Sequence, residues 1–256
     1  MIQHPEPTAE LQPSEELRRE LEEQGIAEGS YRVQRLDAVR KTVARRLMAA
    51  YSEIPHFPLR MRIAADALLD ARERRNAGEG ERVSLNDLFI KAAALAIARF
   101  PGVNVTYTSH GIILHRQADI SVAVAIEGGL ITPIVRAAES RSIAEISADM
   151  KRLADAARRK RLQPAEYFGG TFSISNLGMF GISEFSSILN PPQSCILSLG
   201  APQREYCPDE YGNPRLGQIM TATLTCDHRA VDGATGAQWL QAFKDIVENP
   251  SQWIDV

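Results

Sequence analysis

The residues with the clearest chemical potential lie near the C-terminal end of the chain, where a histidine follows a β-rich run. His228 is followed four residues later by Asp232 and then by Gly233. An imidazole titrates close to neutral pH, so His228 could take a proton from a thiol or a hydroxyl. Gly233 permits a sharp turn into a helix that Asp232 or a neighbour could cap. A capped helix with a structural histidine explains the same short pattern, which often occurs by chance.

A second candidate lies where a strand of alternating hydroxyls meets a glycine-rich loop. The strand carries Ser173 and Ser175, and Asn176 and Gly178 follow at the start of the loop. A hydroxyl in that place could donate a hydrogen bond to a developing oxyanion. An edge strand followed by a turn explains these residues equally well. The sequence has no GxSxG elbow that would make Ser175 a hydrolase nucleophile, and it has no phosphate-binding P-loop or GxGxxG.

Metal catalysis is not indicated, because no histidine or cysteine stands at ligand spacing from another. The remaining histidines are expected to be structural or solvated: His4, His56, His110 and His115. The three cysteines include no CxxC pair, which argues against a zinc site or a disulfide framework. We therefore expect reduced, mostly buried thiols at Cys195, Cys207 and Cys226.

The elements that position these candidates can be predicted from hydrophobic periodicity. Helices are predicted at about residues 38–54, 65–76, 85–100, 143–161 and 234–248. Strands are predicted at about residues 56–63, 103–108, 112–116, 120–126, 130–135, 171–176, 194–200 and 219–226. Helices and strands mix without a regular βαβ order, which favours an α/β or α+β layer structure over a doubly wound sheet.

Composition limits the class of protein. At 256 residues with 44% hydrophobic residues, the chain can bury a core without disulfides or metals. Its longest stretch of small apolar residues, Ala92 to Ala98, is far shorter than the ~18 residues that a membrane span needs. The N-terminus lacks the basic and apolar regions of a signal peptide, so we expect no export. Nucleic-acid binding is not indicated, because no basic stripe with interleaved aromatics occurs.

The first 30 residues differ from the rest of the chain. They contain eight acids and two bases, and the prolines Pro5, Pro7 and Pro13. This composition is typical of a tail or linker. One short helix is predicted there, capped by Ser14 and ended by Gly25. We therefore expect an acidic tail or linker at residues 1–30 and a folded domain at residues 31–256.

Five segments in the same order resemble the catalytic domain of dihydrolipoamide acyltransferases, the core components of 2-oxo acid dehydrogenase complexes. They are RKTVARRL with IPHF (40–57), RVSLNDLFIKAAALA (82–96), SVAVAIEGGLITPIV (121–135), GGTFSISNLGMFGISEFSSILNPPQSCIL (169–197) and DHRAVDGA (227–234). The family shares its fold with chloramphenicol acetyltransferase. The resemblance therefore implies a two-layer α/β domain with a mixed sheet and packed helices, assembled as a trimer with active sites between subunits.

The resemblance also implies a role for each matching residue. His228 matches the catalytic histidine, which acts as general base on the thiol of coenzyme A or, in reverse, of dihydrolipoamide. Ser175 matches the hydroxyl that hydrogen-bonds the tetrahedral oxyanion. Asp232 matches the acidic residue of the HxxxDG motif, and Arg40 matches its ion-pair partner. We expect this pair to be buried and to fix the histidine turn without touching substrate.

Within the family, NLGMFGI and GLITPIVRAA most resemble the acetyl-transferring, pyruvate dehydrogenase type. Asn176 and Gly178 belong to this loop and are expected beside the substrate. Ala230 departs from the family, in which a bulkier residue is usual. No lipoyl or subunit-binding domain precedes residue 31, so the lipoyl group is expected on a removed domain or on another protein. The implied partners are a lipoyl domain and the other 2-oxo acid dehydrogenase components, in the cytoplasm or, in a eukaryote, the mitochondrial matrix.

Two alternatives remain beside an acetyltransferase of this kind. The chain could be a stand-alone coenzyme A-dependent acyltransferase with another acceptor, or a non-catalytic structural core subunit. The presence of the catalytic set argues against the structural role. After Pro250 we expect Trp253 and Ile254 to be exposed and to join trimers into a higher-order shell, although both side chains could instead fold back on their own subunit.

Overall fold

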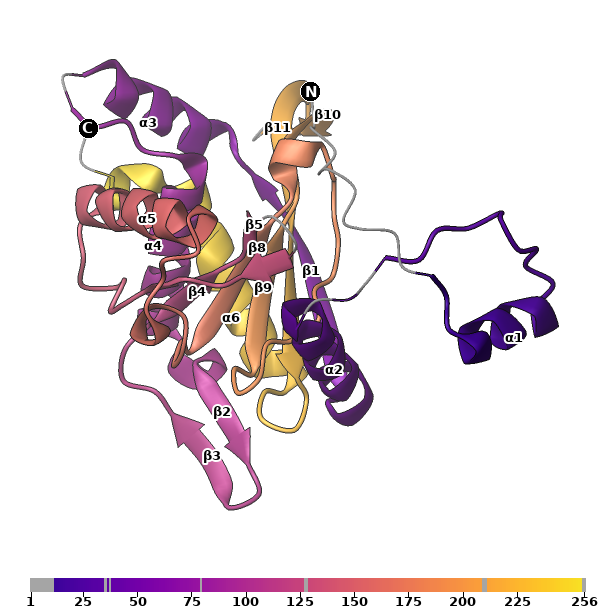
Figure 1. Cartoon of the computed structure of the whole chain (residues 1–256). Coiled ribbons are helices and arrows are strands. Elements are labelled where there is room, and N and C mark those ends of the chain that lie inside the picture. The colour runs from indigo at the N-terminus through magenta and orange to yellow at the C-terminus, as the bar shows by residue number, and fades with distance from the viewer. Residues whose placement is uncertain are drawn as a thin grey trace. The chain divides into compact units, whose positions relative to one another are not determined.

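The computed structural model describes residues 12–34, 36, 38–78, 80–126, 129–208 and 211–254 (Figure 1). The predictions for His4, Pro5 and Pro7 lie outside these residues. The chain divides into two compact units, Met1–Arg46 and Leu47–Val256.

The first unit contains the short helix that the sequence predicts. Helix α1 (Glu15–Glu23) is capped by Ser14, whose Oγ accepts a hydrogen bond from the backbone N–H of Leu17 at 3.2 Å. Gly25 follows with a φ of +76°, a left-handed conformation that ends helices and favours glycine. No residue of α1 is buried. Helix α2 (Ala38–Glu53) begins in the first unit and ends in the second.

The second unit is built on a seven-stranded sheet with the order β1-β11-β9-β8-β4-β7, in which β10 also pairs with β11. Strand β8 is parallel to β4 and to β9, and the other pairings are antiparallel, so the predicted mixed sheet is confirmed. The strands are β1 (His56–Ala64), β4 (Ile120–Val122), β7 (Ile134–Val135), β8 (Phe172–Asn176), β9 (Cys195–Leu199), β10 (Gln203–Pro208) and β11 (Pro214–Asp227).

Two short ribbons lie outside the main sheet. One pairs β2 (Val105–Thr108) with β3 (Gly111–Leu114) as an antiparallel hairpin, and both strands lie where the sequence predicts them. The other pairs β5 (Val124–Ile126) with β6 (Gly129–Ile131). Figure 1 shows the β2–β3 ribbon extending beyond the main sheet.

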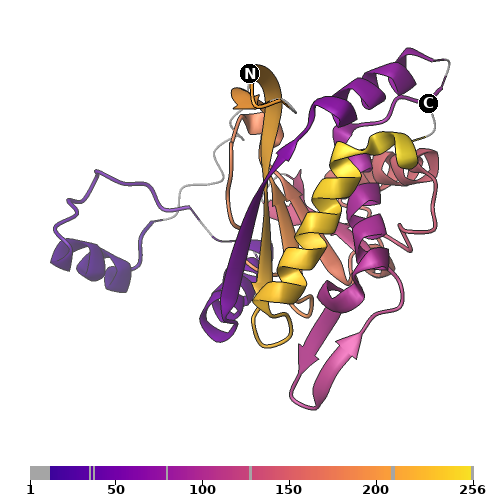
Figure 2. The same cartoon turned by 180° about the vertical axis from the view of Figure 1, so that it is seen from behind.

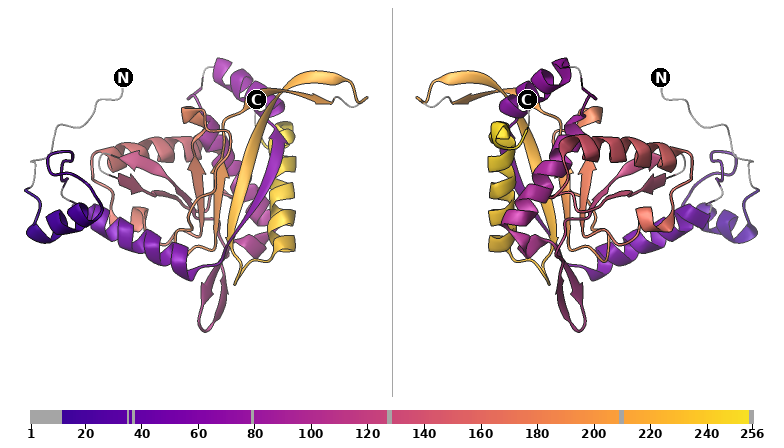
Figure 3. Two further views of the ribbon diagram at one scale, coloured as in Figure 1. Left: turned by 90° about the vertical axis from the view of Figure 1, so that its right-hand side faces the viewer. Right: turned by 90° about the vertical axis from the view of Figure 1, so that its left-hand side faces the viewer.

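Four helices complete the second unit: α3 (Asp66–Ala77), α4 (Leu85–Arg99), α5 (Ile143–Arg158) and α6 (Gly233–Glu248). Helices α4 and α6 lie together across one face of the sheet (Figures 2 and 3). Helix α5 packs beside α4, and α3 packs against α6 and β11. A capping box between Ser84 and Asp87 starts α4, and a second box between Ser142 and Glu145 starts α5.

The centre of the core is aromatic and joins the helices to the sheet. Trp239 and Phe243 stack one turn apart on α6 with ring centroids 5.6 Å apart. Phe172 of β8 lies 5.0 Å from Trp239, and Phe89 of α4 lies 6.4 Å from Phe243. All four side chains are fully buried. Near the start of α6, a Cβ on Gly236 would lie 2.7 Å from the Leu59 side chain, so glycine is what lets the helix approach β1.

The C-terminal end corrects one expectation. Ile254 is only 4% exposed, and the Trp253 indole Nε1 donates a hydrogen bond to the Ile246 carbonyl of α6 at 2.8 Å. A 3-10 turn at Pro250–Gln252 reverses the chain and brings both side chains back onto the core. The expectation that Trp253 and Ile254 are exposed was wrong, and folding back on their own subunit is confirmed. These two side chains therefore give no support to a shell of trimers.

None of the helices in the described part of the chain is long and apolar enough to cross a membrane.

Candidate active site

The turn that carries His228 joins β11 to α6 and is fixed through its backbone. The backbone N–H of His228 donates to the Pro55 carbonyl at 3.0 Å, and that of Asp227 donates to the Ser194 carbonyl at 2.8 Å. The His228 side chain is exposed, and its ring lies edge-on to Phe57 with centroids 4.7 Å apart. Neither ring nitrogen has a hydrogen-bond partner among the described residues. The imidazole is therefore presented to solvent on an ordered backbone, as a general base requires.

Asp232 lies at the start of α6 and caps it. Its Oδ1 accepts a hydrogen bond from the backbone N–H of Thr235 at 2.8 Å. This bond lowers the pKa of Asp232 below its ordinary value, and the charge of His228 contributes a smaller effect in the same direction. Asp232 is exposed, so the expectation of a buried carboxylate was wrong. The ion pair with Arg40, which lies on α2 in the first unit, stays a prediction.

Ser175 lies near the end of β8 and is half-buried. The following residue shapes the loop, because Asn176 Oδ1 accepts a hydrogen bond from the backbone N–H of Gly178 at 2.8 Å. A Cβ on Gly178 would lie 3.1 Å from that oxygen and 3.2 Å from the backbone at Gly200 and Ala201, so a side chain has little room there. The two residues expected beside substrate therefore hold the backbone of the loop that follows Ser175.

The structure does not bring His228 and Ser175 together within one chain. Ser175 lies opposite Ser198 of β9, and Ser198 lies opposite Thr223 of β11. His228 is five residues beyond Thr223 along the chain. At roughly 3.3 Å per residue, His228 and Ser175 are about 16 Å apart in the direction of the strands. They are also two strands apart across the sheet, because β9 lies between β8 and β11. Groups that act on one reacting carbon must come within about 3 Å of it.

The other described histidines have structural places or lie in solvent. His56 accepts a hydrogen bond at Nε2 from the Leu189 backbone N–H, so its Nδ1 must donate to the Ile54 carbonyl 2.8 Å away. His115 Nε2 lies 2.9 Å from Thr106 Oγ1, and burial lowers the pKa of its imidazole, although Asp119 opposes this. His110 is exposed in the β2–β3 turn. The structural or solvated roles expected for these three are confirmed.

The cysteines are free thiols, as expected. Cys195 and Cys226 face each other across β9 and β11 with their sulfurs 3.7 Å apart. Burial raises the pKa of the Cys195 thiol well above its ordinary value, so it is not a reactive thiolate. Within the described ranges, no group of three or more potential ligands is arranged to hold a metal ion.

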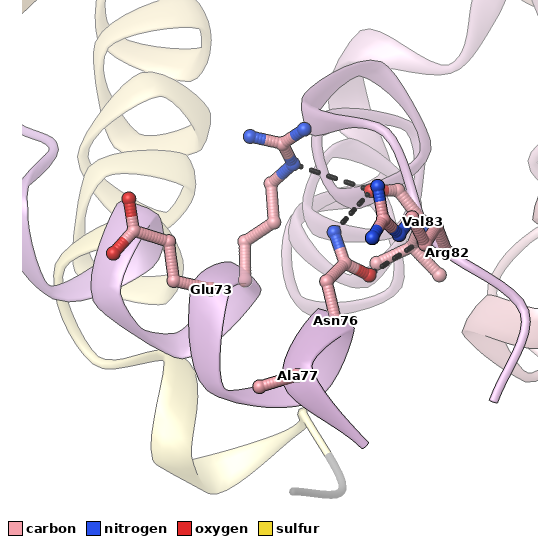
Figure 4. Close-up of a pocket in the computed structure, with 6 residues that line it drawn as sticks. Glu73, Asn76, Ala77, Arg82 and Val83 are labelled. Carbon is pink, nitrogen blue, oxygen red and sulfur yellow. Dashed lines mark hydrogen bonds between the residues drawn. The ribbon is translucent and has the colours of Figure 1, made fainter. Parts of the chain in front are cut away.

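A surface hollow of about 310 Å³ lies between the end of α3 and the segment before α4 (Figure 4). Its lining includes Arg72, Asn76, Arg82 and Val83. The Asn76 side chain exchanges two hydrogen bonds with the Val83 backbone, at 2.9 and 3.0 Å, and Arg72 Nε donates to the Val83 carbonyl at 3.2 Å. These bonds close the loop between the helices. The hollow contains none of the candidate catalytic residues.

Sequence reasoning missed the two residues that flank His228. Asp227 is buried and forms an ion pair with Arg229, with Nη2 and Oδ2 2.8 Å apart. The Arg229 guanidinium also lies 4.2 Å from the centre of the Tyr107 ring. Opposite charges two residues apart in a turn are a detectable signal for the ion pair. The contact with Tyr107 joins segments far apart in the sequence and carries no local signal.

Comparisons with known proteins agree on one family. The model of the 2-oxoacid dehydrogenases acyltransferase (catalytic domain) family matches residues 28–254. A mitochondrial dihydrolipoyllysine-residue acetyltransferase component of the pyruvate dehydrogenase complex from Caenorhabditis elegans is 45% identical over 223 residues, which cover 84% of this chain and 44% of the relative. The corresponding protein from Rhizobium meliloti (strain 1021) is 43% identical over 229 residues, which cover 87% of this chain and 51% of that relative.

A solved structure supports the same assignment. The crystal structure of a probable dihydrolipoamide acetyltransferase from Listeria monocytogenes 4b F2365 matches with a TM-score of 0.82 and 30% sequence identity. The match covers 87% of this chain and 96% of that one. The present chain spans about half the length of the two curated relatives.

Proposed function

Because the chain belongs to the 2-oxoacid dehydrogenase acyltransferase catalytic-domain family, we propose that it transfers an acyl group between a dihydrolipoyl thiol and coenzyme A. The acyl group is acetyl, as the names of the curated relatives and the likeness of its loop to the acetyl-transferring type suggest. The observation that carries the proposal is the exposed His228 imidazole on its fixed turn, within a family match that covers residues 28–254. Both thiols are substrates, and no metal takes part.

In the proposed reaction His228 moves a proton and Ser175 stabilises charge. His228 takes the proton of the coenzyme A thiol, and the thiolate attacks the thioester carbonyl carbon of acetyl-dihydrolipoamide. The tetrahedral oxyanion accepts a hydrogen bond from the Ser175 hydroxyl. When the intermediate collapses, the bond between carbon and the dihydrolipoyl sulfur breaks, and the imidazolium returns its proton to that sulfur. Neither residue needs to form a covalent intermediate.

The separation of His228 and Ser175 supports a site shared between two copies of the chain. One copy supplies the base and a second supplies the oxyanion donor, because one chain keeps the two residues far apart along the sheet. Cyclic symmetry gives each subunit the same contacts with its neighbours. We place three copies in the smallest active assembly, as the family resemblance implies. A larger shell of trimers has no support from the C-terminal side chains.

The remaining assignments concern the parts around this site. We assign residues 31–256 to the catalytic domain and residues 1–30 to an acidic linker, which the family match over residues 28–254 supports. Arg40 and Asp232 are proposed as an ion pair that holds the start of α6. The acyl group is delivered by a lipoyl domain on another part of the protein or on a partner of the pyruvate dehydrogenase type. The reaction would take place in the cytoplasm or, in a eukaryote, in the mitochondrial matrix.

An acetyl-transfer assay with acetyl-coenzyme A and free dihydrolipoamide tests the proposal. Thioester formation on dihydrolipoamide by the wild-type chain, and its loss in His228→Ala, would support it. Activity with another acceptor alone would indicate the stand-alone acyltransferase. A folded wild-type trimer inactive with every acceptor would indicate a structural core subunit. An acetylated lipoyl domain is the sharper donor, because the stand-alone alternative does not require it.

A further inference from the structure

An ion pair between the two residues that flank His228 closes its turn. Asp227 is the last residue of β11, and only 4% of its side chain is exposed. Arg229 Nε donates to Oδ1 of Asp227 at 2.9 Å, and Nη2 donates to Oδ2 at 2.8 Å. The backbone N–H of Arg229 adds a third bond to Oδ1 at 3.0 Å. This paired geometry matches a guanidinium to a carboxylate, and a lysine ammonium cannot reproduce it.

The guanidinium of Arg229 is held from a second side by an aromatic ring. Its Cζ lies 4.2 Å from the centroid of Tyr107, which belongs to β2. A cation over an aromatic face is attracted by the negative charge of that face. Figures 1 and 2 show the β2–β3 ribbon beside the loop that joins β11 to α6. The hydrogen bond to Asp227 raises the pKa of Arg229, so the guanidinium keeps its charge.

The ion pair acts on the backbone that orients His228. The Asp227 carbonyl accepts hydrogen bonds from the backbone N–H groups of Ala230 at 3.0 Å and Val231 at 2.9 Å. His228 therefore lies between two residues joined to each other, in a turn closed by its own backbone. Among the described residues, the imidazole ring packs edge-on against Phe57 and has no hydrogen-bond partner. The backbone of the turn is thus the main determinant of where the imidazole points.

We propose that the ion pair of Asp227 and Arg229, stacked on Tyr107, positions His228 for proton transfer. The proposal rests on the proposed function, in which His228 is the general base. Arg229 acts through the turn and is a positioning residue, not a catalytic one. Proton transfer needs the two heavy atoms within hydrogen-bond reach, and a misplacement of about 1 Å can lower a rate ~10²-fold.

Arg229→Lys is the first test, because it keeps the positive charge and removes the planar guanidinium that makes the paired hydrogen bonds. We expect kcat to fall by about 10- to 100-fold, while KM for coenzyme A and for dihydrolipoamide stays unchanged. Arg141→Lys is the matched control, since Arg141 forms a partly buried ion pair with Asp149 on α5, with Nη1 and Oδ2 2.7 Å apart. The control should keep the wild-type kcat. A wild-type kcat in Arg229→Lys would overturn the proposal.

Chemical rescue separates positioning from general destabilisation. In Arg229→Ala, added ethylguanidinium should restore part of kcat, because it can form two parallel hydrogen bonds with Asp227 and stack on Tyr107. Ethylammonium has the charge but not the planar fork, and it should restore less. Equal rescue by both cations would show that charge alone matters and would contradict the proposal.

A readout that does not depend on catalysis keeps this proposal separate from the proposed function. In Arg229→Lys, the backbone amides of Arg229's neighbours Ala230 and Val231 should exchange hydrogen faster than in the wild type. If wild-type protein is inactive, the proposed function fails, and the exchange rates still report on the turn. Tyr107→Leu leaves the ion pair in place and should fold, with a smaller fall in kcat than Arg229→Lys. Unchanged exchange and unchanged kcat in both variants would refute the positioning role.

Discussion

The two regions that the proposed reaction needs are held in different ways. The turn of His228 is bound to three other segments, through Pro55 before β1, Ser194 before β9 and Tyr107 of β2. The end of β8 that carries Ser175 leads into a loop with large exposed apolar side chains. In that loop, 82% of Met179 and 64% of Phe180 are exposed.

The difference indicates how the site is divided. A turn tied on several sides places the base before any partner arrives, which is the preorganisation that catalysis uses. Exposed apolar side chains near the oxyanion donor are typical of a surface that another molecule covers. In the proposed mechanism, each chain therefore positions its own His228. Ser175 comes close to a histidine only at the boundary with another subunit.

The largest effect is expected from His228→Ala. Loss of the general base should lower kcat by about 10²- to 10⁴-fold. The melting temperature should not change, because the side chain is exposed and its loss leaves no buried cavity. Steady-state kinetics and calorimetry on the same preparation measure both. A nearly normal kcat would show that the proton goes elsewhere.

Ser175→Ala should lower kcat by about 10²- to 10³-fold, the usual effect of losing one oxyanion donor. KM should change little, because the hydrogen bond strengthens only in the transition state. Ser173→Ala is a useful control, since Ser173 lies on the same strand but is buried, and its hydroxyl donates to the Gln193 side chain. Equal losses of kcat in both variants would indicate that strand packing, and not the oxyanion, explains the effect.

Dilution should abolish activity without unfolding the chain. The His228 turn is complete in one subunit, whereas the proposed site needs two, so dissociated subunits should stay folded and inactive. Sedimentation should show a mass near three chains at the concentrations that support activity. An active species smaller than a trimer would contradict the shared site.

Asp232 should give the smallest effect. Asp232→Ala removes both the capping oxygen and the charge and should lower the melting temperature by a few degrees, whereas Asp232→Asn keeps the cap, loses only the proposed pairing with Arg40 and should lower it less. The pKa of Asp232 is lowered in the folded chain, so its contribution to stability is present above the ordinary carboxyl pKa and is lost as pH falls below about 4. Thermal unfolding from pH 7 to pH 3 should therefore bring wild type and Asp232→Ala closer together.

A measurable loss of stability in Asp232→Asn, which keeps the cap but removes the charge, would support the proposed ion pair with Arg40. Arg40→Gln should then produce the same loss. If neither variant changes the melting temperature, the ion pair is absent.

Much of this arrangement follows from local sequence patterns. The helices predicted by apolar spacing are present, and Ser14, Ser84 and Asp232 cap the helices that follow them. Strand β10 was not predicted, because its residues are mostly polar and exposed and it is held only by pairing with β11. Trp253 and Ile254 were expected on the subunit surface, because their packing depends on a chain reversal that periodicity does not detect.

The site shows the same limit. The type and spacing of His228, Asp232 and Ser175 identified them as candidates. The distance between His228 and Ser175 depends on strand register, which pairs residues far apart in sequence. The stacking of Arg229 on Tyr107 depends on the placement of the β2–β3 ribbon. Such contacts are properties of the folded chain and not of any one segment.

Complementation between two inactive variants tests the shared site most directly. Chains with His228→Ala and chains with Ser175→Ala should be produced together, so that mixed trimers form, and their acetyl transfer should be compared with that of each variant alone. If a base from one subunit works with a hydroxyl from the next, random mixing of equal amounts restores about one quarter of the sites. Each restored site needs a chain with intact His228 beside a chain with intact Ser175, and symmetry makes every such boundary equivalent. If mixed trimers form and show no more activity than the separate variants, the two residues do not share a site across subunits, and the account is wrong.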